Sequence, residues 1–67
     1  MNPVARAIEI VGGVSALARK VGCSRQAVYN WKSGALQVPA ELALKIEEAT
    51  LGRVKRQDLR PDLYEPA

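Results

Sequence analysis

The sequence predicts an all-α fold, a small bundle of four to five short helices. Apolar residues recur at helical spacings, such as i, i+1 and i+4, along most of the chain, and no alternating run is long enough for a sheet. Glycine or proline separates these periodic segments. The 67 residues, 48% of them hydrophobic and none of them phenylalanine, allow one small domain with an aliphatic core around a single tryptophan.

The first helix is predicted to begin at Asn2-Pro3. Asparagine is a good N-cap, and proline at the first helical position gives up an N–H group that has no partner there anyway. Its apolar stripe consists of Val4, Ile8 and Val11. Gly12-Gly13 is expected to end this helix.

The stretch from Val14 to Gly34 is predicted to form two helices joined by a tight turn. The apolar stripe of the first consists of Leu17, Ala18 and Val21, and that of the second consists of Ala27, Val28 and Trp31. Gly22 lies between them, where a helix end favours a residue that tolerates positive φ. Ser24 is a good N-cap for the second helix, and Gly34 can end it.

The second helix of this pair has a polar and basic outward face. The residues on it are Arg25, Gln26, Tyr29, Asn30, Lys32 and Ser33. Residues 14–34 contain four basic residues and no acid, whereas the rest of the chain has six basic residues against seven acidic ones. Two short helices, a glycine turn and a basic second helix are typical of a DNA-binding helix-turn-helix.

Four residues of that face are predicted to reach DNA bases. Arg25 and Gln26 occupy the first turn, which enters the major groove most deeply, and can bind guanine and adenine edges respectively. Tyr29 and Asn30 lie one turn further on, and Tyr29 could contact a thymine methyl group or a phosphate. The alternative for Arg25 and Gln26 is that they are two ordinary surface residues.

Five further residues are better placed for phosphates, contacts that position a protein without reading sequence. They are Ser15, Ser24, Lys32, Ser33 and Lys20. Lys20, near a helix end, could instead be simply solvated. Trp31 could be imagined as a stacking residue and Cys23 as a redox group, but their positions favour a core residue and a small turn residue.

The C-terminal third is predicted to complete the bundle. After a loop at 35–38, a helix is expected from about Pro39 to Thr50. Its buried residues are predicted to be Leu42, Ala43, Ile46 and Ala49. Val54 and Leu59 are expected to pack a last helical turn. Residues 1–60 would then form the domain and residues 61–67 an extended tail.

The helix pair resembles the helix-turn-helix of Cro-type phage repressors, with Ala18 followed by Gly at +4, Val at +10 and Trp at +13. More specifically, the run SALARKVGCSRQAVYNWKSG…VPAELALKIEEAT…GRVKRQDLRPDLY resembles the YdaS family of Cro-like regulators from prophage regions, also labelled antitoxins. The resemblance covers about Val11 to Tyr64. It implies a lambda-repressor-like fold and a transcriptional repressor that places helix 24–33 in the major groove of an operator.

The chain departs from the Cro-type pattern at one position. Many of those domains begin the first motif helix with a glutamine that contacts a phosphate, and this chain has Val14 there. Ser15 or a free backbone N–H group could replace that contact.

The expected partner is double-stranded DNA. One helix reads only a few base pairs, so a weak homodimer is expected to form on the operator through the C-terminal third. The apolar candidates for that contact are Leu44, Leu51, Leu63 and Tyr64. The rival function is an antitoxin whose main partner is a toxin protein, with autoregulatory DNA binding.

The composition argues against several other classes of protein. Without histidine, and with Cys23 as the single cysteine, one chain offers no disulfide scaffold, no histidine-based metal site and little nucleophile–base catalysis. No enzyme, metal, cofactor or small-molecule ligand is therefore expected. No apolar run approaches the ~20 residues that span a membrane, so the predicted location is the cytoplasm, at the nucleoid.

Overall fold

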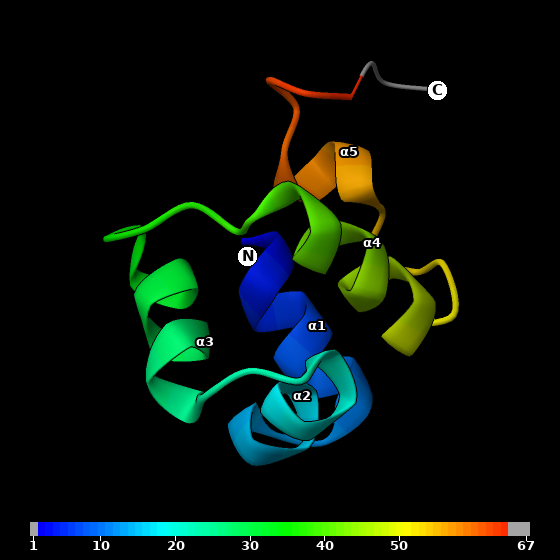
Figure 1. Cartoon of the computed structure of the whole chain (residues 1–67). Helices are drawn as coiled ribbons and strands as arrows, with labels where there is room; N and C mark the ends of the chain where they lie inside the picture. Colours follow the sequence, from blue (N-terminus) through cyan, green and yellow to red (C-terminus); the bar gives the residue numbers. More distant parts are fainter. Residues whose placement is uncertain (1, 65–67) are drawn as a thin grey trace.

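The computed structural model describes residues 2–64, which form five helices and no strand. The helices are α1 (Pro3–Val11), α2 (Val14–Val21), α3 (Arg25–Ser33), α4 (Ala40–Ala49) and α5 (Arg56–Leu59). In Figure 1, α1 runs through the middle of the molecule, with α2 below it, α3 and α4 on opposite sides and α5 above. The predicted all-α bundle around a central helix-turn-helix is confirmed.

The predicted caps explain where the helices begin and end. The Asn2 Oδ1 atom accepts a hydrogen bond from the Ala5 N–H group at 2.7 Å, and Ser24 Oγ accepts one from Ala27 N–H at 3.1 Å. Gly22 adopts the left-handed conformation, with φ of 82°, and ends α2. The tight turn between α2 and α3 therefore follows from local sequence.

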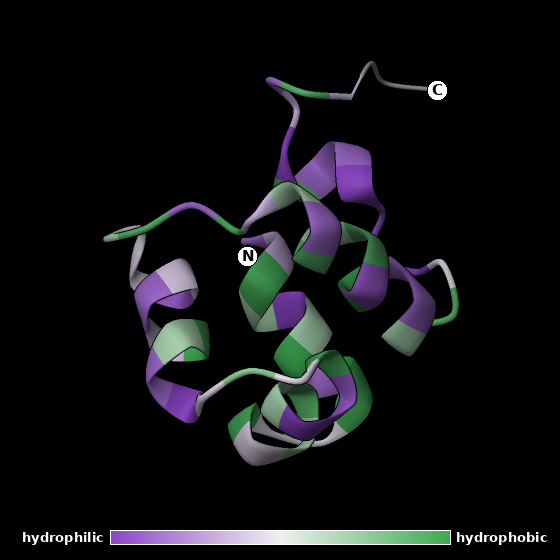
Figure 2. Ribbon diagram, in the orientation of Figure 1, coloured by the Kyte–Doolittle hydropathy of each residue, from purple (hydrophilic) through white to green (hydrophobic). Residues whose placement is uncertain are grey.

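The core is aliphatic and takes residues from α1, α2, α3 and α4. Figure 2 shows that hydrophobic and hydrophilic residues alternate along these helices. Its buried residues are Val4, Ala7, Leu17, Ala18, Val21, Val28, Trp31, Val38, Ala43, Ile46 and Val54. Trp31 is only 7% exposed, which confirms its predicted place in the core. Leu42 and Ala49, expected to be buried, are only partly so. Val38 of the predicted loop is instead buried.

Thr50 is a buried polar residue that joins α4 to the segment after it. Its hydroxyl donates to the Ile46 carbonyl at 3.0 Å and accepts from the Val54 N–H group at 3.1 Å. Thr50 follows α4 as its C-cap, and Pro39 precedes it as the N-cap, so the helix is one residue shorter at each end than predicted. These hydrogen bonds offset the cost of removing the hydroxyl from water, so a polar group can occupy the core.

Residues 61–64 form a turn, whereas the sequence predicted an extended tail from residue 61. The Leu63 and Tyr64 N–H groups donate to the Arg60 carbonyl at 3.0 and 3.1 Å. The Arg60 guanidinium adds contacts to this turn and to the loop before α4. It donates to the Val38 carbonyl at 2.9 Å and, through two nitrogens, to the Asp62 carboxylate at 2.9 and 2.7 Å. The hydrogen bonds from Arg60 lower the pKa of the Asp62 carboxyl below its usual range. The remaining tail, residues 65–67, lies outside the described residues.

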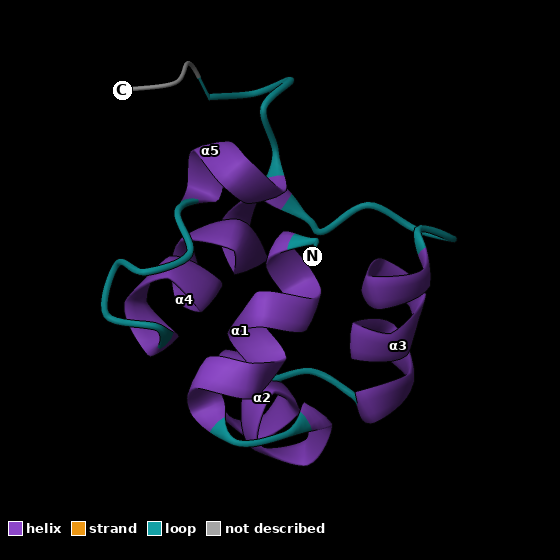
Figure 3. Cartoon of the chain, turned by 180° about the vertical axis from the view of Figure 1, so that it is seen from behind, coloured by secondary structure: helices purple, strands orange, loops and turns teal. Residues whose placement is uncertain are grey.

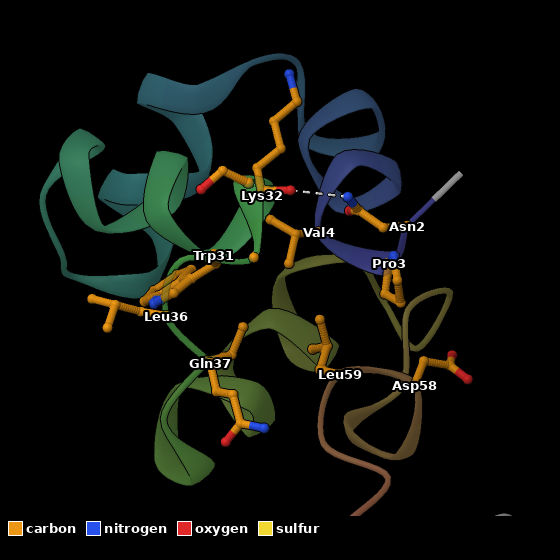
Figure 4. A pocket seen from close by; sticks show the side chains of 12 residues that line it. Asn2, Pro3, Val4, Trp31, Lys32, Leu36, Gln37, Asp58 and Leu59 are labelled. Carbon is orange, nitrogen blue, oxygen red and sulfur yellow. Dashed lines mark hydrogen bonds between the residues drawn. The ribbon is translucent and has the colours of Figure 1, made fainter.

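Replacing Asn2 with alanine is expected to lower the free energy of unfolding by about 1–2 kcal/mol. The change removes the α1 N-cap and also a second contact, because Asn2 Nδ2 donates to the Lys32 carbonyl at the end of α3, at 3.1 Å (Figure 4). Urea unfolding measures the loss. Asn2→Asp keeps the capping oxygen but loses the amide that donates to the Lys32 carbonyl. Its free energy of unfolding is expected to lie between those of the parent and the alanine variant. An alanine variant as stable as the parent would contradict both roles.

Candidate DNA-binding surface

One side of α3 carries no contact with the rest of the bundle. Val28 and Trp31 face inward, and α3 packs on α1 and α2. The opposite side, at the left edge of the molecule in Figure 1, presents Arg25, Gln26 and Tyr29, all exposed, with Tyr29 at 50%. The helix therefore offers a free polar row of the width that a major groove accepts.

Asn30 lies at the edge of this row and is partly buried. Its Oδ1 atom accepts a hydrogen bond from Gln26 Nε2 at 3.1 Å, one helical turn away. That leaves Gln26 with its Oε1 atom and its second amide hydrogen unpaired within the helix, the two groups that an adenine edge would engage. The i, i+4 spacing of Gln26 and Asn30 is the sequence signal that indicates such a pair.

The three phosphate candidates at the ends of α3 differ in whether their side chains already form hydrogen bonds within the protein. Ser24 Oγ accepts the capping bond, which leaves its O–H group able to donate to a phosphate. Ser33 donates to the Asn30 carbonyl at 3.2 Å, so its hydroxyl would have to rotate to reach a phosphate. Lys32 is exposed, and Figure 4 shows its ammonium group pointing away from the pocket that Asn2 and Leu59 line.

Ser15 is exposed in the first turn of α2, beside N–H groups that no side chain caps. The N-cap residue is Gly13, which has no oxygen to offer. The first turn of α2 therefore presents backbone donors and the positive end of the helix dipole, an arrangement suited to an anion. It is the location where the Cro-type glutamine is missing and Val14 stands.

Lys20, another predicted phosphate contact, is exposed on the side of α2 that faces α4. It lines a groove with Lys45, Glu48 and Ala49 of α4. The helical period predicts the buried stripe of α2, with one exposed side on either side of it. The sequence alone does not indicate which of these two sides faces α4.

Cys23 fills the turn between α2 and α3 and packs partly against the core. Burial raises the pKa of its thiol above the ordinary value, which keeps the thiol protonated at neutral pH. Among residues 2–64 no group of three or more histidine, cysteine, aspartate or glutamate residues is placed to hold a metal ion. None of the helices described is both long and apolar enough to span a bilayer.

Comparison with known proteins places this geometry in a family. Residues 4–67 match the family model described as "Bacterial toxin YdaS". The chain is 47% identical over 58 residues to the "Putative transcriptional regulator YdaS" of Escherichia coli (strain K12); the match covers 87% of this chain and 59% of that relative's length.

The fold itself matches a solved structure. It superposes with a TM-score of 0.90 and 41% identity on the "Cro protein from putative prophage element Xfaso 1 in Xylella fastidiosa strain Ann-1", covering 98% of this chain and all of that one. Sequence and fold agree over nearly the whole length, and the chain belongs to the YdaS family.

Proposed function

We propose that the chain is a sequence-specific DNA-binding transcriptional regulator that places α3 in the major groove of an operator. The observation that carries the proposal is the free polar face of α3, in a stretch with four basic residues and no acid. The names of the two relatives, a transcriptional regulator and a Cro protein, support it. The family description names a toxin, a different class of activity, for which α3 offers no comparable support.

In this proposal Arg25, Gln26 and Tyr29 contact base edges from the first two turns of α3. Asn30 contacts the adjoining base or holds the Gln26 amide in place through their hydrogen bond. Ser15, Ser24, Lys32 and Ser33 bind phosphates and fix the register of α3 in the groove. Occupying an operator in this way would block RNA polymerase, so we propose that the regulation is repression.

Selection from random duplex DNA followed by gel-shift titration tests the proposal. We expect an enriched site with a conserved pattern of guanine and adenine at fixed spacing, bound more tightly than scrambled duplex by a factor of at least about 10³. Enrichment of no site, or equal affinity for scrambled duplex, would contradict sequence-specific binding.

Replacing Lys32 with alanine is expected to weaken binding to the selected site and to scrambled DNA by the same factor. A lysine that neutralises one phosphate releases about one counterion, so the slope of log K against log salt should fall by about one. The Asn2 contact to α3 uses the Lys32 carbonyl and is retained in the variant. A changed sequence preference would show instead that Lys32 reads a base.

A weak homodimer on DNA is expected to supply the specificity that one helix cannot. Two exposed leucines of the C-terminal third, Leu44 and Leu63, would form the contact. Sedimentation at micromolar concentration should give mostly monomer, and the operator should take up two copies cooperatively. A tight dimer without DNA, or one copy per operator at saturation, would contradict this arrangement.

A further inference from the structure

Leu51 combines a strained backbone with an unburied apolar side chain. Its φ is 55°, in the left-handed region, and the residue is 90% exposed. Its N–H group donates to the Glu48 carbonyl at 3.1 Å, and that of Gly52 donates to the Glu47 carbonyl at 2.8 Å. These two bonds define the helix ending in which glycine normally holds the position of Leu51. A leucine there strains the backbone and covers nothing in its own chain.

A shallow groove of about 320 Å³ adjoins Leu51, where the ends of α1, α2 and α4 meet. Ile10, Val11 and Ala49 supply its apolar lining, and Lys20 and Arg53 line it as well. Figure 2 shows a hydrophobic segment at the outer edge of the loop after α4. An exposed leucine therefore lies beside a groove whose lining is partly apolar and partly basic.

The charge around this groove is positive. The neighbouring groove shares Lys20 and Ala49 with it and adds Lys45 and Glu48, so three cations surround the site against one exposed acid. The Glu47 carboxylate is engaged elsewhere, since its Oε1 atom accepts a hydrogen bond from the backbone N–H group of Arg56 at 2.8 Å. A second copy using the same surface would bring like charges together, whereas a segment with carboxylates beside its apolar residues would complement it.

The surface lies on the opposite side of the molecule from α3. Figures 1 and 3, which view the chain from the front and from behind, both place the loop after α4 and helix α3 at opposite edges. An exposed leucine offers neither a charge nor a hydrogen-bond donor to a DNA phosphate. A ligand bound at Leu51 would not compete with a duplex bound to α3. We propose that Leu51 and its groove bind an acidic, apolar segment of another protein, independently of DNA binding.

Panning a phage-displayed library of random 12-residue peptides on the full chain tests this proposal without requiring DNA. Enriched peptides are then synthesised, and their affinities are measured by fluorescence anisotropy. Leu51→Gly removes the projection and relieves the strain, so the variant should melt at or above the temperature of the parent. Leu36→Ala is the matched control, an exposed leucine of the loop after α3 that does not line the groove.

We expect peptides that combine aspartate or glutamate with leucine, isoleucine or phenylalanine. Leu51→Gly should weaken their binding at least tenfold and Arg53→Glu at least threefold, while Leu36→Ala should stay within twofold of the parent. The peptides should leave binding to the selected duplex unchanged. The proposal is overturned if no such peptides are enriched, if Leu51→Gly binds them as the parent does, or if Leu51→Gly weakens DNA binding instead. Failure of DNA binding alone would overturn only the function proposed for α3.

Discussion

Replacing Trp31 with alanine is expected to unfold the domain or to leave it barely folded. The indole fills the core from α3 and is 7% exposed. Large-to-small changes at buried aromatic residues cost about 3–5 kcal/mol, because the neighbours collapse only partly into the space. A domain of 67 residues has a total stability of roughly 3–10 kcal/mol, so one such loss removes much or all of it. Urea unfolding followed by circular dichroism measures the effect.

Tyr29→Ala is the matched control for that experiment. Tyr29 belongs to the same helix and is also aromatic, but it is half exposed. Its removal should change the free energy of unfolding by less than about 1 kcal/mol, as for most surface positions. If Trp31→Ala stayed folded and lost only DNA affinity, Trp31 would be a contact residue and its core assignment would be wrong.

Sequence predicted the helix-turn-helix closely because local interactions determine it. The Ser24 cap is a hydrogen bond to a residue only three positions away. Helix α2 ends because Gly22 itself adopts the left-handed conformation. The positions of Val28 and Trp31 in the core follow from a helical period that any burial of α3 must respect. The outward face of α3 is then the remaining side.

Sequence missed the features that join distant segments. Val38 is buried, and its carbonyl accepts from Arg60, which lies 22 positions further along the chain. Nothing in the local pattern around residue 60 indicates that partner. Lys20 shows the same limit, because its flank of α2 meets α4 only after the bundle has closed. Leu51 is a third case, since its residue type argues against the left-handed backbone that it adopts.

Replacing Arg25 with alanine is expected to abolish discrimination at one or two base pairs of the operator. Arg25 is exposed in the first turn of α3, directly after the Ser24 cap, where side chains reach most deeply into a major groove. A bidentate contact to guanine O6 and N7 supplies about 1–3 kcal/mol of discrimination, which corresponds to a factor of about 5–150. The fold should be unaffected, because the side chain is not part of the core.

Competition gel shifts with every single-base variant of the selected site measure this loss position by position. The Arg25→Ala variant should bind the selected site about as weakly as it binds the site in which the contacted guanine is replaced. Its base preferences at the other positions should be those of the parent protein. Arg53→Ala is the control, an exposed arginine on the opposite side of the molecule that should change neither affinity nor preference. Equal weakening on selected and scrambled duplex would identify Arg25 as a phosphate contact, and the base-reading role would then rest on Gln26 and Tyr29.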